Sequence, residues 1–349
     1  MAGPSCSGER PIDRLSPVKA VVITKHGGPG VLEVQERPDP ELGPGQLRIE
    51  VAAAGVNFAD VMARMGLYPD APKPPCVVGY EVAGTILELG EGVEGFMPGQ
   101  RVVAGTMFGG YASQVVVPAG DVVALPEQLT FERGAAIPVN YGTAWAALIA
   151  YGNLQHGERV LVHSAGGGVG IAATQIAKRT GAEVYGTASP GKHARITELG
   201  VDQALDYTKA GWERGLPGFD VILDAVGGRS FRRSYSLLRP GGRLVAFGAS
   251  SLVSGERRNL LTALRGLASM PRFNPLKMMS DSKAVIGLGL LPLWKDRKTL
   301  APWIVPLRAL LDDGTIRPVV AGEFRFEEAG AAHSMIVERR NVGKVVLIP

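Results

Sequence analysis

The pattern of hydrophobic and polar positions divides the chain into two regions. Along residues 18–125, short β-branched runs are separated by turns that contain Gly and Pro, which is typical of strands. We therefore expect an irregular all-β domain of the small-barrel kind in this region. The predicted strands have the sequences KAVVITK, QLRIEVAAAG, EVAGTILELG, QRVVAG and YASQVVVPAG.

After Gly157, apolar runs alternate with amphipathic stretches at helical spacing. This alternation predicts an α/β fold with a doubly wound parallel sheet. Ligands of such sheets bind beyond the carboxyl ends of the strands, where the strand order reverses. The predicted strands are 159–164, 183–188, 203–207, 219–226 and 243–249, and the predicted helices are 169–180, 191–199 and 229–238.

Two segments lie outside these regions. Residues 1–16 precede any periodic pattern, and we expect them to form a flexible tail. Residues 131–151 are Ala-rich, with apolar residues at helical spacing, and are interrupted at Pro138. They predict helical segments on both sides of this proline, which lead into the second domain.

Composition narrows the class of protein. The chain has 349 residues with 47 Gly and 25 Pro, and so many turn residues exclude a helical bundle or a coiled coil. The hydrophobic fraction of 46% excludes a disordered chain, and the length favours two domains. With 37 Lys and Arg against 33 Asp and Glu, the charge is nearly balanced and does not predict nucleic-acid binding.

The sequence contains two cysteines, Cys6 and Cys76, which exclude a disulfide framework and a Cys-rich zinc site. The N-terminal residues lack the apolar core of a signal peptide. The longest apolar run, residues 284–294, is too short to span a bilayer. We therefore expect a soluble, cytoplasmic protein without stable membrane insertion.

The most informative passage is the glycine-rich turn after the first strand of the second region. Residues 165–170, AGGGVG, follow a strand and open the predicted helix. Gly167 would let the backbone approach a pyrophosphate, and Gly170 would allow close packing of helix on sheet. The phosphates would lie on the unpaired N–H groups at the helix N-terminus. This context predicts a dinucleotide-binding turn.

The end of the next strand bears on the choice between NAD and NADP. NAD-binding folds place Asp or Glu at this tip to accept a hydrogen bond from the ribose 2′-OH, whereas here the sequence is GTASPGK. Ser189 and Lys192 are available instead, and Tyr207 closes the third strand nearby. Hydroxyls and a cation suit a 2′-phosphate, so we expect NADPH. The alternative is that Lys192 is a solvated residue at a helix start.

Taken together, the motifs resemble the medium-chain dehydrogenase/reductase superfamily, in its zinc-independent quinone oxidoreductase branch. Within this branch, their sequences are most similar to those of the vesicle amine transport protein-like subgroup. The resemblance implies a GroES-like, β-rich substrate domain in residues 17–140 and 300–349. A Rossmann domain would occupy residues 141–299. It also implies a homodimer, with the predicted strand Val285–Leu290 paired across a two-fold axis. The motifs are AAGVNFADVMARMGLYP (53–69), VVGYEVAGTILELGEGV (77–93), MPGQRV (97–102), GGYASQVVVP (109–118), PVNYGTAW (138–145), VLVHSAGGGVGIAATQIAK (160–178) and NVGKVVLIP (341–349).

The sequence departs from the zinc-dependent members of this superfamily. Where those enzymes carry a Cys and then a Gly-His-Glu, this chain has residues 54–57, AGVN, and residues 79–81, GYE. We therefore expect no metal site, and we expect Glu81 to be structural. Without a Lewis acid, hydride transfer to an already activated acceptor is the easier chemistry, which favours quinones or α,β-unsaturated carbonyls as small-molecule substrates.

The resemblance also implies roles for individual residues. Asn57 stands at the position of the substrate-polarising Asn, although it could instead, or in addition, cap the helix that follows. Tyr68 could donate a hydrogen bond or a proton, or could serve in packing. An aromatic residue that many quinone oxidoreductases carry is replaced by Met62, so substrate stacking is not carried over.

Further cofactor contacts follow from the resemblance, and for all of these residues except Asn140 and Thr143 the alternative role is packing. They lie in the pyrophosphate loop, at the carboxyl ends of strands or in segments that face the nicotinamide. The residues are Asn140, Thr143, Gly166, Gly167, Gly168, Val169, Phe247, Gly248, Ser250, Leu288, Leu290 and Asn341.

Two questions stay open at this level. Residues 251–283, which include Met270, Met278, Met279 and several Arg, could form a solvated helix with an apolar underside, a substrate lid or a surface with weak membrane attraction. The function best supported is an NADPH-dependent, zinc-independent quinone or enone reductase. The alternatives are an enoyl-thioester reductase and a cofactor-binding protein with a mainly structural or interaction role.

Overall fold

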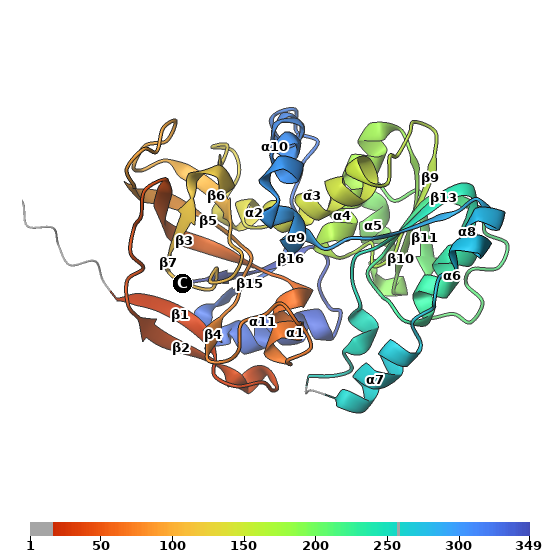
Figure 1. Ribbon diagram of the computed structural model, residues 1–349, viewed down its shortest axis with the longest axis horizontal. Helices are drawn as coiled ribbons and strands as arrows, with labels where there is room; N and C mark the ends of the chain where they lie inside the picture. The colour runs from red at the N-terminus through yellow and green to blue at the C-terminus, as the bar shows by residue number, and fades with distance from the viewer. Residues whose placement is uncertain (1–16, 257–258) are drawn as a thin grey trace, which may run out of the picture.

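The computed structural model describes residues 17–256 and 259–349 and shows two lobes (Figure 1). A β-rich lobe, at the left of Figure 1, holds both the early strands and the last strand of the chain. The second lobe, at the right, is built on a parallel sheet flanked by helices. The expected tail, residues 1–16, lies outside the described residues, as do Arg257 and Arg258 of the 251–283 segment.

The β-rich lobe contains two sheets. A three-stranded sheet has the order β2-β1-β4, and a seven-stranded sheet has the order β15-β16-β3-β5-β6-β8, with β7 paired to β3. The five strands predicted in this region are confirmed as β1, β3, β5, β6 and β7. The strands are β1 (Val18–Ile23), β2 (Leu32–Arg37), β3 (Gln46–Val56), β4 (Cys76–Val77), β5 (Glu81–Leu89), β6 (Arg101–Gly105), β7 (Gln114–Pro118), β8 (Val122–Ala124), β15 (Val320–Arg325) and β16 (Lys344–Ile348).

The last strand, β16, is an interior member of the larger sheet. It pairs antiparallel with β3, with Leu347 opposite Ala54, and parallel with β15 on its other side. Its side chains Val345 and Leu347 are buried in the same hydrophobic cluster as β1, β3 and β5. The C-terminal segment therefore returns to the first lobe. Two short helices, α1 (Phe58–Arg64) and α11 (Ala329–Val337), lie together below this sheet (Figure 1).

The second lobe is a six-stranded sheet of order β11-β10-β9-β12-β13-β14, in which every pairing is parallel. The predicted alternation of strands and helices is confirmed, and with it the α/β fold class. The strands are β9 (Arg159–Val162), β10 (Glu183–Ala188), β11 (Gln203–Asp206), β12 (Phe219–Asp224), β13 (Leu238–Ala246) and β14 (Ala284–Gly287), and the helices are α4 (Gly168–Thr180), α5 (His193–Glu198) and α6 (Arg229–Leu237).

One predicted boundary is wrong. The strand expected over Val285–Leu290 ends at Gly287, and Leu290 is instead the first residue of helix α9 (Leu290–Lys295). Gly289 precedes this helix with an extended backbone, and Pro292 follows in its first turn, where a missing N–H is tolerated. Helix α10 (Arg297–Asp312) follows directly and runs across the residue-300 boundary expected from the resemblance.

Helices between the lobes connect the two cores. Helix α2 (Phe131–Gly134) ends before Pro138, where α3 (Pro138–Trp145) begins and continues as a π-helical turn, Ala146–Ala150. The predicted break at the proline is thus confirmed. Trp303 and Leu311 of α10 are buried in the hydrophobic cluster that also contains residues of α3, α4 and β9.

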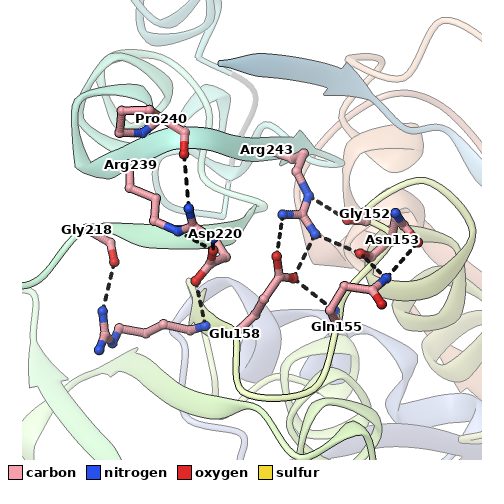
Figure 2. Close-up of polar contacts among 10 residues, drawn as sticks. Gly152, Asn153, Gln155, Glu158, Gly218, Asp220, Arg239, Pro240 and Arg243 are labelled. Atoms are coloured by element: carbon pink, nitrogen blue, oxygen red, sulfur yellow. Dashed lines mark hydrogen bonds and ion pairs between the residues drawn. The ribbon is translucent and has the colours of Figure 1, made fainter. Parts of the chain in front are cut away.

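Figure 2 shows an ion-pair network at the amino ends of the central parallel strands. The glycine turn follows the carboxyl end of β9, at the opposite end of the sheet. Arg243 of β13 donates to both carboxylate oxygens of Glu158 at 2.9 and 2.8 Å. It also donates to the carbonyl oxygens of Gly152 and Asn153 at 2.7 and 2.8 Å. Asp220 of β12 forms an ion pair with Arg239 and accepts from the Arg159 N–H. These bonds fix the loop that leads into β9.

The 251–283 segment folds into two helices, α7 (Leu260–Ala268) and α8 (Pro275–Asp281). Ala263 and Gly266 are buried, but most apolar side chains of the segment are exposed. The segment therefore matches only in part the expected solvated helix with an apolar underside. Leu264 of α7 is 62% exposed and Met279 of α8 is 73% exposed. Within the described part of the chain, no helix has the length and apolar character needed to cross a membrane.

Candidate active site

The glycine turn lies at the carboxyl end of β9, at the junction of the two lobes. Gly167 forms an isolated parallel bridge with Gly343, the residue just before β16. The Gly343 N–H donates to the Gly166 carbonyl oxygen at 2.9 Å. The C-terminal strand of the first lobe therefore enters beside the loop predicted to hold a pyrophosphate.

Because the loop is rich in glycine, it packs closely against neighbouring atoms, and the N-terminus of α4 has no side-chain cap. A Cβ on Gly170 would lie 2.4 Å from the Ser164 carbonyl oxygen, and one on Gly168 would lie 2.5 Å from Nδ2 of Asn140. Gly167 precedes α4 and offers no side-chain cap, so the first N–H groups of this 13-residue helix can donate hydrogen bonds to an anion. The loop present here thus fits the pyrophosphate of a dinucleotide.

A basic cluster lies beside this loop. The Lys192 Nζ donates to the Asn341 carbonyl oxygen at 2.6 Å, and a Cβ on Gly166 would lie 3.4 Å from its Cδ. Burial and, secondly, the nearby Arg339 guanidinium lower the pKa of Lys192. Arg339 Nη1 donates to the Tyr207 hydroxyl at 3.4 Å. Two cations and a phenol thus gather at one edge of the loop.

Arg339 was missed by the sequence reasoning, although it joins two predicted residues here. Its backbone has a φ of 57°, in the left-handed region, at the turn between α11 and β16. The ERR run at residues 338–340, immediately before Asn341, was the available signal. Ser189, the remaining residue predicted for the 2′-phosphate, immediately precedes the 3-10 turn Pro190–Lys192.

The remaining predicted cofactor residues lie along the same junction. Asn140 and Thr143 are buried on α3, and Asn140 faces Gly168. Gly248 and Ser250 follow β13, where the Ser250 N–H donates to the Ala225 carbonyl oxygen at 3.1 Å. Phe247 directly precedes them and is half-buried, and Val169 lies in the first turn of α4. Leu288 is buried after β14, while Leu290 packs towards Gly142.

Asn57 stands at the N-cap position of α1, where it forms a capping box with Asp60, and its side chain also bonds residues of two strands. The backbone N–H of Asn57 donates to Oδ2 of Asp60 at 2.7 Å, so the Asp60 carboxylate caps this turn. The Asn57 side chain accepts from the Lys344 Nζ at Oδ1, at 2.6 Å, and donates from Nδ2 to Oε1 of Glu81 at 3.1 Å. Sequence reasoning gave Lys344 no role of its own, because an isolated lysine at the start of a strand gives no sign of being buried.

Glu81 and Lys344 form a buried ion pair next to Asn57. The Lys344 side chain is 2% exposed and that of Glu81 is 0% exposed. Glu81 also accepts the Val139 N–H at Oε2, at 2.8 Å. The carboxylate therefore links β5, β16 and the start of α3.

A second buried polar chain continues from Asp60. Its Oδ1 accepts the Gly79 N–H at 3.1 Å, and its Oδ2 accepts the Tyr111 hydroxyl at 3.0 Å. That hydroxyl also lies 3.2 Å from Nε2 of His333. Burial raises the pKa of Asp60 to about 7 although these donors oppose it, and burial together with Arg64 lowers the pKa of His333 to about 3.

Tyr68, the other predicted catalytic residue, lies in an aromatic group. Its ring centroid is 6.4 Å from that of Tyr80 in an edge-to-face arrangement, and Tyr80 lies 5.2 Å from Phe108. Burial, followed by the charge of Asp70, raises the pKa of Tyr68, so its hydroxyl keeps its proton. Tyr80 occupies the position at which the zinc-dependent pattern has a histidine. Among residues 17–256 and 259–349, no three His, Cys, Asp or Glu side chains gather as a metal site.

Comparisons with known proteins agree with this geometry. Residues 43–127 match the alcohol dehydrogenase GroES-like domain, and residues 199–347 match the zinc-binding dehydrogenase model. The human synaptic vesicle membrane protein VAT-1 homolog is 37% identical over 340 residues, which cover 95% of this chain and 86% of that protein.

Solved structures show the same arrangement. The quinone oxidoreductase of Escherichia coli, crystallised with NADPH, superposes with a TM-score of 0.82 at 29% identity, covering 95% of this chain and 100% of the other. The CurK enoyl reductase superposes with a TM-score of 0.83 at 25% identity, covering 95% and 99%.

The fold and the site define a two-lobed protein with a GroES-like domain and a dinucleotide-type parallel sheet. The chain belongs to the medium-chain dehydrogenase/reductase superfamily, in its quinone oxidoreductase-like group, and it is similar to the VAT-1 homologs.

Proposed function

We propose that this protein is a zinc-independent, NADPH-dependent reductase of quinones or α,β-unsaturated carbonyls. One observation carries the proposal: the turn from Arg339 to Lys344 contacts the phosphate loop, the basic cluster and Asn57. Arg339 bonds Tyr207, the Asn341 carbonyl oxygen accepts from Lys192, Gly343 bonds Gly166, and Lys344 bonds Asn57. A phosphate loop, a basic cluster and a carboxamide donor are thus held together by six consecutive residues.

The residues that would hold NADPH form two groups, one for its pyrophosphate and one for its 2′-phosphate. In this proposal the N–H groups at the start of α4 take the pyrophosphate, while Lys192, Tyr207 and Arg339 take the 2′-phosphate. NADPH supplies a hydride when bound. The division into a substrate domain, residues 17–140 and 300–349, and a cofactor domain, residues 141–299, and the assembly into a homodimer in the cytoplasm are parts of the same proposal.

The role of Asn57 is to stabilise negative charge on the acceptor. An N–H of its carboxamide donates to the carbonyl oxygen of a quinone or enone as charge develops there. Such a donor typically contributes about 3–4 kcal/mol in the transition state. Tyr68, whose raised pKa keeps it protonated, supplies a proton or a second hydrogen bond.

An assay of NADPH oxidation tests this function. The wild type is given an ortho-quinone, a simple enone and an enoyl-CoA in turn, and each assay is repeated with NADH. We expect turnover with the quinone or the enone and a preference for NADPH. Preference for the enoyl-CoA supports enoyl-thioester reduction, which the likeness to the CurK enoyl reductase favours as second candidate. If NADPH binds but none of the three acceptors is reduced, a structural or interaction role replaces the proposal.

Asn57→Ala tests the site directly. We expect kcat with the best acceptor to fall about 10²–10³-fold, because one oxyanion donor is lost. Asn274→Ala is the matched control, because Asn274 also occupies an N-cap position, that of α8. Unchanged kcat in Asn57→Ala would show that Asn57 is structural.

A further inference from the structure

We propose that the buried Glu81–Lys344 pair sets the orientation of the Asn57 carboxamide and so keeps one of its N–H groups available to the substrate. Both are positioning residues, since they act through Asn57. The inference rests on the proposed function, in which Asn57 polarises the acceptor. It gives Glu81, which sequence reasoning took as structural only, a part in the reaction.

The two partners of the Asn57 side chain differ in their hydrogen-bonding capacity. The Lys344 ammonium can only donate hydrogen bonds, and the Glu81 carboxylate can only accept them. The Asn57 carboxamide has one oxygen and one nitrogen, and in the structure its Oδ1 faces Lys344 at 2.6 Å while its Nδ2 faces Glu81 at 3.1 Å. Rotation of the amide by half a turn would place nitrogen against ammonium and oxygen against carboxylate. Both charge-assisted bonds would be lost, so only one orientation is populated.

The remaining N–H of Asn57 follows from this orientation. The amide nitrogen carries two hydrogens, and Glu81 accepts one of them. The other nearby acceptor, the Gly55 carbonyl oxygen, lies at 3.5 Å, at the outer limit for a hydrogen bond. Donation from Lys344 to Oδ1 also polarises the amide and makes the loosely held N–H a better donor.

Both partners are fixed by backbone contacts. Glu81 is held by the Val139 N–H, and a Cβ on Gly55 would approach its Oε1 to 2.7 Å, so the carboxylate fills this space closely. The Lys344 N–H donates to the Val319 carbonyl oxygen at 2.8 Å. Because Lys344 directly follows Gly343, its position is also tied to the phosphate loop.

The pair is poorly explained by stability alone. Two buried charges lose their hydration, and replacing such a pair by apolar residues is often neutral or stabilising. An apolar pair could fill this space, but it could not distinguish the oxygen from the nitrogen of an amide. The geometry therefore indicates that the charges of Glu81 and Lys344 serve to orient the Asn57 carboxamide.

The test removes both charges together, so that no lone charge is left buried. In Glu81→Gln/Lys344→Met we expect kcat with the best acceptor to fall at least about 10-fold, towards the 10²–10³-fold of losing a donor outright. The Kd for NADPH and the KM for the acceptor stay within about 2-fold, because only transition-state stabilisation is lost. Lys178→Met/Asp202→Asn, which removes an exposed pair at 2.8 Å, is the matched control and leaves all three unchanged.

The decisive comparison is in the Asn57→Ala background. If the pair acts through Asn57, adding Glu81→Gln/Lys344→Met to Asn57→Ala causes no further loss of kcat. An equal loss in both backgrounds would overturn the inference, because the pair would then act independently of Asn57.

A second measurement separates this inference from the proposed function. If the wild type reduces none of the acceptors, the proposed function fails, yet the orientation of Asn57 can still be observed by NMR. Its two side-chain N–H signals are assigned by their absence in Asn57→Ala. We expect them to be widely separated in the wild type and to converge in Glu81→Gln/Lys344→Met. Signals that the double substitution leaves in place would refute the positioning role.

Discussion

His333 and Asp60 lead to a prediction about how stability depends on pH. Both side chains are fully buried, and both contact the Tyr111 hydroxyl. His333 faces Tyr111 and Arg64, and Asp60 faces Tyr111, the Asn57 and Gly79 N–H groups and the charge of Lys344. Burial moves the pKa of His333 from 6.5 to about 3 and that of Asp60 from 3.8 to about 7.

The two groups act on stability in opposite directions. The folded state keeps His333 neutral, so its contribution is fully present above pH 6.5 and is lost as the pH falls towards about 3. The folded state keeps Asp60 protonated, so its contribution is present below pH 3.8 and is lost as the pH rises through about 7. At about 1.4 kcal/mol per pH unit, each contribution changes by about 3 kcal/mol between pH 7 and pH 4. In the wild type the two changes largely cancel.

Single substitutions of His333 or Asp60 separate the two opposing dependences of the free energy of unfolding on pH. In His333→Leu we expect the free energy of unfolding to rise by about 3 kcal/mol relative to the wild type as the pH falls from 7 to 4, because the opposing histidine is gone. In Asp60→Asn it should fall by about the same amount over the same range. Urea denaturation at several pH values measures both, and the comparison uses slopes, so a changed baseline in either variant does not affect it. Curves that run parallel to the wild type across this range would refute the reasoning.

Three further predictions concern the two lobes. Arg339→Ala should raise the KM for NADPH about 10–100-fold through loss of a charged bond to the 2′-phosphate, and steady-state assays should show the KM for NADH unchanged. Arg243→Met leaves the half-buried Glu158 carboxylate without its ion-pair partner. It should lower the free energy of unfolding, measured in urea, by about 3 kcal/mol. The Kd for NADPH should stay constant in that variant, since the pair lies at the opposite edge of the sheet. Gly170→Ala puts a Cβ 2.4 Å from a loop carbonyl oxygen and should weaken NADPH binding, measured by fluorescence, by more than about 10-fold, whereas Gly191→Ala, with open space around it, should not.

Local sequence patterns were sufficient to predict most strands and helices of the second lobe. The alternation of apolar runs and amphipathic stretches predicted β9 to β13, because parallel strands need long crossover connections, which are usually helices. The strand boundary at Leu290 was wrong, since an apolar run does not show whether it continues as a strand or turns into a helix such as α9. In the first lobe, β2 and β4 were missed because both are short or largely polar.

The candidate site was predictable where it is local and was missed where it depends on distant pairing. The glycine turn, Lys192 and Tyr207 could be recognised from their neighbours in sequence. Arg339 and Lys344 were missed, because the partners that give them a role lie 132 and 287 residues away along the chain. No periodicity marks a charged residue that becomes buried through such a contact.

The interior place of β16 has a consequence for synthesis of the protein on the ribosome. The edge of β3 that β16 covers is made early, but 287 residues separate Asn57 from Lys344, whose side chain completes the pair with Glu81. At translation rates of about 5–20 residues per second, this edge waits roughly 15–60 seconds for its partner. During that time β3 can pair with β5 and β7, but its edge at residues 54–56 stays open, and an open strand edge is the kind of surface that recruits foreign strands. The first lobe to be synthesised is therefore completed only when the end of the chain is made, and chaperones that protect open sheet edges would have their largest effect in this interval.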